Sequence, residues 1–357
     1  MNEDHKLLLE ALDLASQRKG YTSPNPAVGA IVIKEGKVLG RGFHWGTGSP
    51  HAEVEALKNL GNEATGATLY VTLEPCCHFG KTPPCTDLLK SKKLERVVYG
   101  FIDPNPIVAG KGGEILTQSG IKAKYLPLSE IENFYQNYAW WTKTRKTWLT
   151  GKLAVSKDGN VCSSNGSPVK ITGELANELT HFRRNQADVI VTSVATLKAD
   201  DPRLDVRCGS NVIRKPVWVL DKQLSFSMEC QLMKTALSIT LVHGKSASGV
   251  KKEKLKSVGI ECVEISEVDS ELLLSELAVR LGERGYHEAW CEFGPRLFSA
   301  FTKNRLFNEL ILYQSTQVEI CNGRRAFEEE RGWVLDDYRI ASEERLGADV
   351  KESWVLK

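Results

Sequence analysis

The sequence predicts an α/β protein of two domains, and three observations lead to that prediction. The chain has 357 residues, whereas a single hydrophobic core usually stops growing at about 250–300 residues. Apolar runs of strand length alternate with helix-like segments, which is typical of helices on both faces of a sheet. Aromatic residues mixed with Lys and Arg at 134–148 interrupt this alternation, and we interpret them as a helix and linker rather than a base-stacking surface. We therefore expect domains at residues 1–145 and 146–357.

The elements of the first domain follow from the spacing of its apolar residues. Residues 7–15 have the periodicity of a helix that ends near Gly20. Residues 28–33 and 38–44 are strand-like and flank a short turn, so we expect a hairpin. The remaining expected elements are a helix at 51–60, a strand at 67–73, a helix at 82–91 and a strand at 96–101.

The second domain continues the alternation without an internal repeat, so it is not a duplicate of the first. Its expected elements are strands at 149–155, 189–192, 217–220, 239–243, 289–291 and 310–313, with helices such as 271–284 between them.

Composition restricts the class of function. The net charge is only +2 with the charges interspersed, so we expect small-molecule substrates and no nucleic-acid partner. No apolar run reaches the roughly 18 residues that a membrane span needs, and the first residues are polar, so we expect no membrane association and a cytoplasmic protein. The nine cysteines are an odd number, which favours free thiols in a reducing compartment over a disulfide framework.

Two short motifs carry the chemistry of the first domain. The sequence His51-Ala52-Glu53 precedes a loop that runs from Cys76 to Cys85. One imidazole and two thiolates can hold zinc with a fourth position left for water, and this arrangement is typical of catalytic zinc. Zinc lowers the pKa of bound water towards about 7. Glu53 lies near the expected start of a helix, where it can move protons without binding the metal.

Other interpretations of these residues remain open. A closed structural zinc site would need Cys77 or His78 as a fourth ligand, and it would leave the His-x-Glu arrangement without a purpose. The glycine cluster at 110–113 superficially suggests a phosphate loop, but it lacks the GxGxxG spacing and we expect it only to start a helix.

The motifs resemble those of the bifunctional deaminase/reductases of riboflavin biosynthesis. Zinc nucleobase deaminases in general carry H-x-E with P-C-x-x-C, in which two residues separate the cysteines. Here eight residues separate Cys76 from Cys85, as in the riboflavin family. Further matching segments are Pro24-Asn25-Pro26-Ala27-Val28-Gly29, His44, Thr72-Leu73-Glu74-Pro75-Cys76 and Asp103-Pro104-Asn105-Pro106. The resemblance implies a cytidine-deaminase-like domain followed by a dihydrofolate-reductase-like domain, and it spans essentially the whole chain.

The resemblance also implies roles in the first domain. His51, Cys76 and Cys85 would bind Zn²⁺, and Glu53 would be the acid/base. The implied substrate is a 2,5-diamino-pyrimidinone that carries a ribosylamino 5-phosphate and loses ammonia. Its implied contacts are Asn25, His44, Lys81, Asp103 and Asn105.

In the second domain the resemblance implies reduction of the ribosyl group to ribityl by NADPH. The implied cofactor contacts are Ala154, Lys170, Thr196, Asp200, Asp221, Gly294, Pro295, Arg296 and Leu297. The implied substrate contacts are Lys152, Pro168, Arg184, Leu204, Arg207 and Glu292. Asp200 is the candidate for handling the ribose proton, and arginines can clamp a phosphate by paired hydrogen bonds. We also expect a homo-oligomer, either a dimer or a tetramer.

The second half departs from the family pattern at two places. Pro168-Val169-Lys170 stands where the family often has Ser-x-Trp, and residues 314–319 replace an Ala-Pro segment with a Leu-Gly turn. A degenerate reductase that serves as a scaffold is therefore an alternative for this half. For the whole chain, the alternatives are a deaminase of tRNA bases and a non-catalytic zinc protein with four protein donors.

Overall fold

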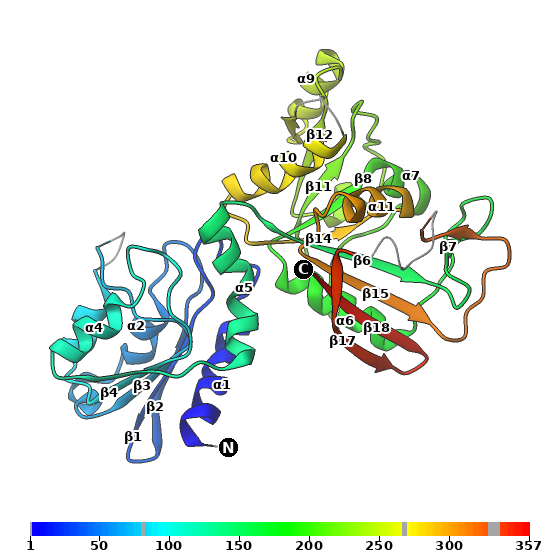
Figure 1. Ribbon diagram of the computed structural model, residues 1–357. Helices are drawn as coiled ribbons and strands as arrows, with labels where there is room; N and C mark the ends of the chain where they lie inside the picture. The colour runs from blue at the N-terminus through cyan, green and yellow to red at the C-terminus, as the bar shows by residue number, and fades with distance from the viewer. Residues whose placement is uncertain (1, 80–82, 266–269, 328–335) are drawn as a thin grey trace. The chain divides into compact units, whose positions relative to one another are not determined.

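The computed structural model describes residues 2–79, 83–265, 270–327 and 336–357, and side chains within residues 270–274 are outside the description. The chain divides into two compact units, Met1–Arg145 and Lys146–Lys357 (Figure 1).

The first unit is built on a five-stranded sheet of order β2-β1-β3-β4-β5. Strand β1 (Gly29–Lys34) pairs antiparallel with β2 (Lys37–Phe43) and with β3 (Thr68–Val71). The pairs of β3 with β4 (Arg96–Tyr99) and of β4 with β5 (Lys122–Tyr125) are parallel. The expected hairpin is therefore confirmed, within one residue at each end of the second strand.

Helices cover both faces of this sheet. The helices are α1 (Glu3–Ser16), α2 (Ala52–Leu57), the short 3-10 helix η1 (Gly61–Ala64), α3 (Cys85–Ser91), α4 (Lys111–Gln118) and α5 (Ser129–Thr144). Side chains of α2, α3 and α4 share one core with Ala30 and Val32, whereas α1 and α5 pack on the other face around Tyr70 and Val98. Because successive residues of a strand point to opposite faces, the apolar strands supply both cores.

The second unit is built on a nine-stranded sheet of order β13-β12-β11-β8-β14-β6-β15-β18-β17. Its strands are β6 (Trp148–Val155), β8 (Val189–Ser193), β11 (Pro216–Leu220), β12 (Ser238–His243), β13 (Glu261–Glu264), β14 (Glu288–Glu292), β15 (Glu309–Ser315), β17 (Tyr338–Leu346) and β18 (Asp349–Leu356). The pairs from β13 to β15 are parallel, and β18 and β17 add antiparallel strands at one edge.

Helices also cover both faces of the larger sheet. On one face, α10 (Ser270–Glu283) and α11 (Pro295–Lys303) pack against a core rich in phenylalanine. The other face carries α6 (Glu174–Gln186), α7 (Val194–Asp200), α8 (Leu232–Thr235) and α9 (Gly249–Ser257). Two small two-stranded sheets complete the unit: β7 (Asn160–Cys162) with β16 (Arg324–Arg325), and β9 (Val206–Cys208) with β10 (Asn211–Ile213).

The structure corrects some expected boundaries. The helix expected at 82–91 begins at Cys85, because Pro84 disfavours helical backbone in the residue before it; Thr82 lies outside the described residues. Helix α1 ends at Ser16 rather than near Gly20. Strands β5 and β17 were not expected, because both carry mostly exposed polar residues at the edge of a sheet. An edge strand with charged side chains lacks the alternation on which strand prediction depends.

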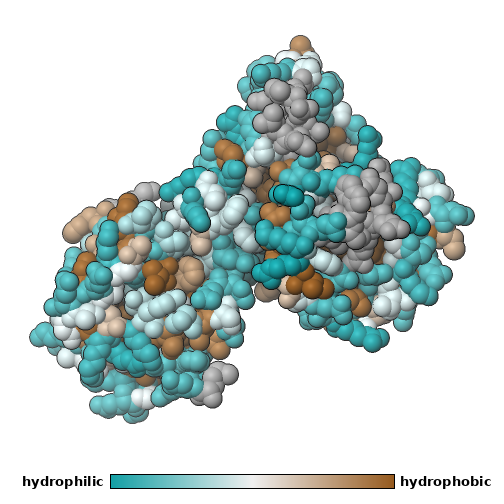
Figure 2. All heavy atoms as spheres, viewed as in Figure 1, coloured by the Kyte–Doolittle hydropathy of each residue, from teal (hydrophilic) through white to brown (hydrophobic). Residues whose placement is uncertain are grey.

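None of the described helices is both long enough and apolar enough to span a bilayer. Hydrophilic residues cover most of the face drawn in Figure 2.

Candidate functional site

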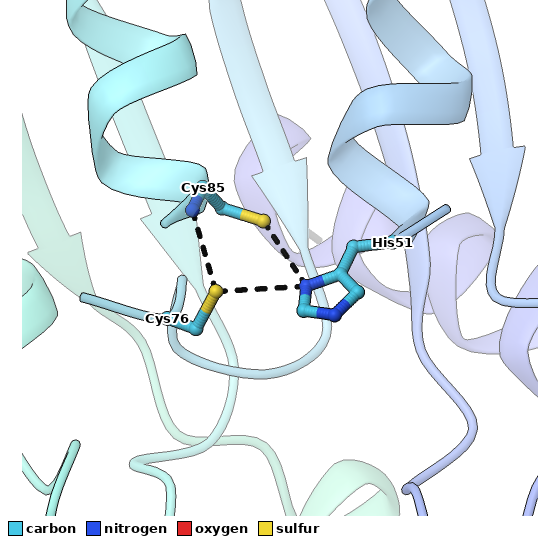
Figure 3. A group of neighbouring side chains, drawn as sticks. All are labelled: His51, Cys76 and Cys85. Atoms are coloured by element: carbon cyan, nitrogen blue, oxygen red, sulfur yellow. Dashed lines mark hydrogen bonds between the residues drawn. The ribbon is translucent and has the colours of Figure 1, made fainter. Parts of the chain in front are cut away.

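Three side chains that could bind a metal ion meet at one point of the first unit (Figure 3). His51 is the N-cap residue of α2, Cys85 is the first residue of α3, and Cys76 lies in the loop that follows β3. The Nδ1 atom of His51 lies 3.2 Å from Sγ of Cys85 and 3.5 Å from Sγ of Cys76. The three ligand atoms all lie within 4.8 Å of one another. Residues far apart in the sequence thus form one cluster because two helices begin beside the same loop.

The donor set fits zinc. Bond lengths of about 2.0 Å to nitrogen and about 2.3 Å to sulfur place tetrahedral ligands roughly 3.5–3.8 Å apart, close to the observed distances. Across the described ranges, the group that could hold a metal consists of His51, Cys76 and Cys85 and includes neither Cys77 nor His78. A closed structural site would need a fourth protein donor, so this geometry favours the open, catalytic arrangement.

Electrostatics within the cluster favour a thiolate at Cys76. Hydrogen bonding from the Cys85 thiol and then from the His51 imidazole lowers the pKa of Cys76 to about 4, although burial opposes the shift. The backbone N–H of Cys85 also donates to Sγ of Cys76, at 3.3 Å. Zinc binds thiolate rather than thiol, so the site is already arranged to present one charged sulfur.

Glu53 stands next to this cluster without belonging to it. It is the second residue of α2 and only 4% exposed. Burial, and next the charge of Cys76, raise the pKa of its carboxyl group. A carboxyl group with a raised pKa can both accept and donate a proton near neutral pH.

His44 and Asn25 lie beside the metal ligands. The His44 ring meets the His51 ring edge-on, with centroids 5.8 Å apart. Its Nδ1 lies 3.0 Å from the carbonyl oxygen of Pro50, and its Nε2 lies 3.1 Å from Nδ2 of Asn25. Burial lowers the pKa of His44, so the neutral ring donates to Pro50 and accepts from the amide. This network fixes both side chains at the site.

Asp103 and Asn105 lie in the loop after β4. Asp103 is 7% exposed, and burial raises its pKa to about 6. Its Oδ1 accepts hydrogen bonds from the backbone N–H of Asn105 (2.9 Å) and from the hydroxyl of Tyr138 (3.2 Å). Lys81, the remaining predicted contact of this domain, lies outside the described residues.

Glu74 is a polar residue of this region to which the sequence assigned no role. It is 3% exposed, and its carboxylate accepts backbone hydrogen bonds from Asp103 (3.3 Å), Gly110 (2.8 Å) and Gly113 (3.2 Å). A Cβ atom on Gly112 would lie 2.2 Å from the carbonyl oxygen of Pro75. The glycine cluster at 110–113 therefore starts α4, as expected, and lets that helix approach Pro75 closely. The same glycine cluster is the sequence signal that could have pointed to Glu74.

The second unit contains a cavity of about 790 Å³, within the usual range for ligand sites. The predicted residues that line it are Lys152, Ala154, Pro168, Lys170, Thr196, Asp200, Glu292, Gly294, Pro295, Arg296 and Leu297. The predicted residues that do not line it are Arg184, Leu204, Arg207 and Asp221. Segments around β6, β7, α7 and β14 thus converge on one cavity, together with Arg324, which the sequence did not suggest.

The cavity contains a fixed negative charge at Glu292. Arg184 donates from Nε and Nη2 to the two carboxylate oxygens, at 2.5 and 2.9 Å, and Trp290 donates from its indole at 2.9 Å. Burial raises the pKa of Glu292, but the charge and the hydrogen bonds of Arg184 have the larger opposite effect and lower this pKa to about 2. Burial lowers the pKa of Lys152. Arg184 is thus engaged with Glu292 and, through Nη1, with the carbonyl oxygen of Asp205 (3.0 Å).

The other residues that do not line the cavity have different surroundings. Leu204 is buried in the core beneath α7, and the exposed Arg207 lies 3.6 Å from Oδ1 of Asp205. Asp221 is 1% exposed and accepts hydrogen bonds from the hydroxyl of Ser225 and the N–H of Phe226. Asp221 therefore shapes the loop after β11.

The cavity fits a phosphate-bearing cofactor at one side. Gly294 is the N-cap residue of α11, with open space where its Cβ would stand. The unpaired N–H groups of a helix start favour phosphate groups. Partial burial raises the pKa of Asp200, at the end of α7.

Two family models match the chain. The cytidine and deoxycytidylate deaminase zinc-binding region matches residues 1–101. The RibD C-terminal domain matches residues 147–330.

Curated relatives and solved structures extend the match to nearly the whole chain. The riboflavin biosynthesis proteins RibD of Aquifex aeolicus and Escherichia coli are each 35% identical, over 88% and 87% of this chain and 87% of each relative. A structure of Acinetobacter baumannii RibD superimposes with a TM-score of 0.84 at 28% identity, covering 99% of both chains. A deaminase/reductase from Thermotoga maritima gives 0.85 at 25% identity, covering 100% of both. These matches confirm the expected cytidine-deaminase-like and dihydrofolate-reductase-like domains. The chain therefore belongs to the RibD family of riboflavin biosynthesis enzymes, with a zinc-binding deaminase domain and a reductase domain.

Proposed function

We propose that residues 1–145 deaminate 2,5-diamino-6-(5-phosphoribosylamino)pyrimidin-4(3H)-one and that residues 146–357 then reduce the ribosyl group of the product to ribityl. The observation that carries the proposal is the convergence of His51, Cys76 and Cys85 beside the buried Glu53. The similar protein from Thermotoga maritima is a diaminohydroxyphosphoribosylaminopyrimidine deaminase and a 5-amino-6-(5-phosphoribosylamino)uracil reductase, which supports this pair of reactions.

In the first reaction, Glu53 moves the protons. A zinc ion held by His51, Cys76 and Cys85 would supply a Lewis acid that activates water and stabilises the oxyanion. Glu53 takes a proton from the attacking water and delivers it to the ring nitrogen. It then takes the second proton from the hydroxyl group formed by the addition and delivers it to the amino group, which leaves as ammonia. Its raised pKa suits a group that must hold the proton between these transfers.

The substrate contacts proposed for this domain are Asn25, His44, Lys81, Asp103 and Asn105. The fixed network of Asn25 and His44 can read the edge of a pyrimidine, since both side chains offer polar atoms in set directions. Asp103 has one engaged oxygen and can accept from an amino or hydroxyl group with the other. Lys81 would supply a point charge for the phosphate.

In the second reaction, the cavity of the second unit would hold the cofactor and the ribosyl group together. NADPH would supply a hydride to the anomeric carbon of the ribosyl group. The bond between this carbon and the ring oxygen must break, and the ring oxygen must receive a proton. Asp200 and Lys152 both line the cavity, and we assign the proton to Asp200. Glu292, held by Arg184, would orient the sugar hydroxyls. Cofactor contacts proposed at the cavity are Ala154, Lys170, Thr196 and residues 294–297, and Asp221 would act through the loop it shapes.

We further propose a cytoplasmic location and a homo-oligomeric state, a dimer or a tetramer. Nine free cysteines support a reducing compartment. The oligomer rests on the family resemblance, and light scattering coupled to size exclusion tests it directly.

Product identification with the full-length protein tests the function. With zinc bound, the protein should release ammonia from the phosphorylated diaminopyrimidinone and then oxidise NADPH. Glu53→Gln should keep the metal, lose ammonia release, and still oxidise NADPH when the deaminated compound is supplied. Absence of NADPH oxidation in the assay with the deaminated compound would support the degenerate-reductase alternative, which arises because Pro168-Val169-Lys170 departs from the family pattern.

A further inference from the structure

The Asp103 loop of the deaminase domain is held by two different parts of the fold. The Glu74 carboxylate accepts the backbone N–H of Asp103 and the N–H groups of Gly110 and Gly113 at the start of α4. From α5, the hydroxyl of Tyr138 donates to Oδ1 of Asp103 at 3.2 Å. The loop backbone and the carboxylate are therefore fixed by different elements.

The orientation of the Asp103 carboxylate follows from these contacts. Oδ1 is engaged by Tyr138 and by the N–H of Asn105. Within the described parts of the chain, no hydrogen bond reaches Oδ2, although the residue is 7% exposed. Oδ2 is therefore the oxygen that can accept a hydrogen bond from a bound ligand. Removing the Tyr138 hydroxyl would leave the N–H of Asn105 as the one remaining contact of these two at Oδ1, so the carboxylate would be held less firmly in its orientation.

We propose that Tyr138 is a positioning residue of the deaminase, acting through Asp103. The proposal rests on the proposed contact of Asp103 with the substrate. Tyr138 lies on α5, beyond residues 1–101 that match the zinc-binding region. It belongs to the aromatic segment that the sequence analysis interpreted as a helix and linker. It is 9% exposed and packs in the core shared by α1 and α5.

Helix α5 also provides a matched control. Tyr135 lies three residues earlier and is 1% exposed. Its hydroxyl lies 2.6 Å from Oγ1 of Thr72 and donates to the carbonyl oxygen of Ala27 at 2.8 Å, so it bonds to other partners than Asp103. Tyr135→Phe and Tyr138→Phe therefore each remove one buried hydroxyl from the same helix, and only the second touches the Asp103 carboxylate.

The experiment compares the two variants in the full-length, zinc-loaded protein. A hydrogen bond to a charged group is worth roughly one to two factors of ten in a binding constant. Tyr138→Phe should therefore raise KM for ammonia release about tenfold, with kcat within about twofold of wild type. Zinc content and NADPH oxidation should not change. Tyr135→Phe should leave KM unchanged. An unchanged KM in Tyr138→Phe, or the same increase in both variants, would overturn the proposal.

A double-mutant cycle separates positioning from general support. If Tyr138 acts through Asp103, adding Tyr138→Phe to Asp103→Ala should cause no further rise in KM. Additive effects would contradict the inference while leaving the proposed function intact. A wild-type protein that releases no ammonia would instead refute the proposed function itself.

Discussion

Helix α1 is attached to the first sheet by one buried carboxylate, and the strength of that attachment can be measured. Asp4 is 7% exposed. Its Oδ1 accepts from Nη1 of Arg96 (2.9 Å) and from the hydroxyl of Tyr70 (2.8 Å). Its Oδ2 accepts from Nη2 of Arg96 (2.5 Å) and from Nζ of Lys124 (2.9 Å). The Arg96 hydrogen bonds lower the pKa of Asp4 well below its ordinary value, although burial opposes the shift.

Asp4→Asn keeps the shape and removes the charge. Hydrogen bonds to charged groups contribute about 1.5–3 kcal/mol, and solvent weakens this pairing because the Arg96 and Lys124 side chains are 28% and 44% exposed. We expect a loss of about 2 kcal/mol in the free energy of unfolding of the first unit. That loss corresponds to a fall of roughly 4–8 °C in Tm for a domain of this size.

Urea titration provides the assay, read by residual ammonia release with NADPH oxidation as the internal reference for the second unit. Glu3→Gln is the matched control, since Glu3 is exposed and lies in the same first turn of α1. Both variants lose a favourable interaction with the helix dipole, worth about 0.3–1 kcal/mol. The difference between their losses in free energy of unfolding therefore measures the buried contacts of Asp4.

The pH dependence gives a second check. Because the folded pKa of Asp4 is lowered, its contribution is complete above its unfolded pKa of about 3.9 and is lost as the pH falls towards the folded value. The stability advantage of wild type over Asp4→Asn, followed by circular dichroism, should be constant at pH 6–8 and shrink below about pH 4. Equal stability at pH 7, or an advantage that persists undiminished at pH 2–3, would refute this reasoning.

Three further predictions concern the two sites and the packing of α1. Removal of zinc by a chelator should abolish ammonia release and leave NADPH oxidation of the deaminated compound unchanged; parallel loss of both activities would contradict separate sites. Glu292→Gln leaves the Arg184 guanidinium buried without its carboxylate, so we expect the second unit to lose about 3–5 kcal/mol and its NADPH oxidation, with normal ammonia release as the control. Gly29→Ala would place a Cβ 2.0 Å from the carbonyl oxygen of Ala11 and should destabilise the first unit by at least about 1–3 kcal/mol in urea titrations. Gly249→Ala, which meets no atom within 4 Å, should be neutral, and equal effects of the two alanine variants would argue against the close approach of α1.

The cluster of candidate zinc ligands could be predicted because its residues lie in short motifs of the sequence. His51 and Glu53 form one short motif and Cys76 and Cys85 another, and few structures other than a metal site use such residues at such spacing. Apolar periodicity likewise predicted the central strands, where both faces of the sheet are buried.

Contacts between distant segments could not be predicted in the same way. Nothing near Tyr138 indicates that its hydroxyl reaches Asp103, because the contact depends on how α5 packs on the sheet. Arg184 has the residue type expected for a phosphate clamp, yet it is engaged with Glu292, 108 residues later. Strand β17 escaped prediction for a different reason, since its exposed polar residues obey no burial pattern.

Helix α5 sets a limit on how the first half could be produced by itself. A fragment cut at residue 101, where the match to the zinc-binding region ends, would lack Ile131, Tyr135 and Tyr138, which fill one of the two cores of the sheet. Such a fragment would expose the apolar side of β3 and β4 to water and should aggregate. A fragment that ends after residue 145 keeps both cores, so we expect it to fold where the shorter fragment does not.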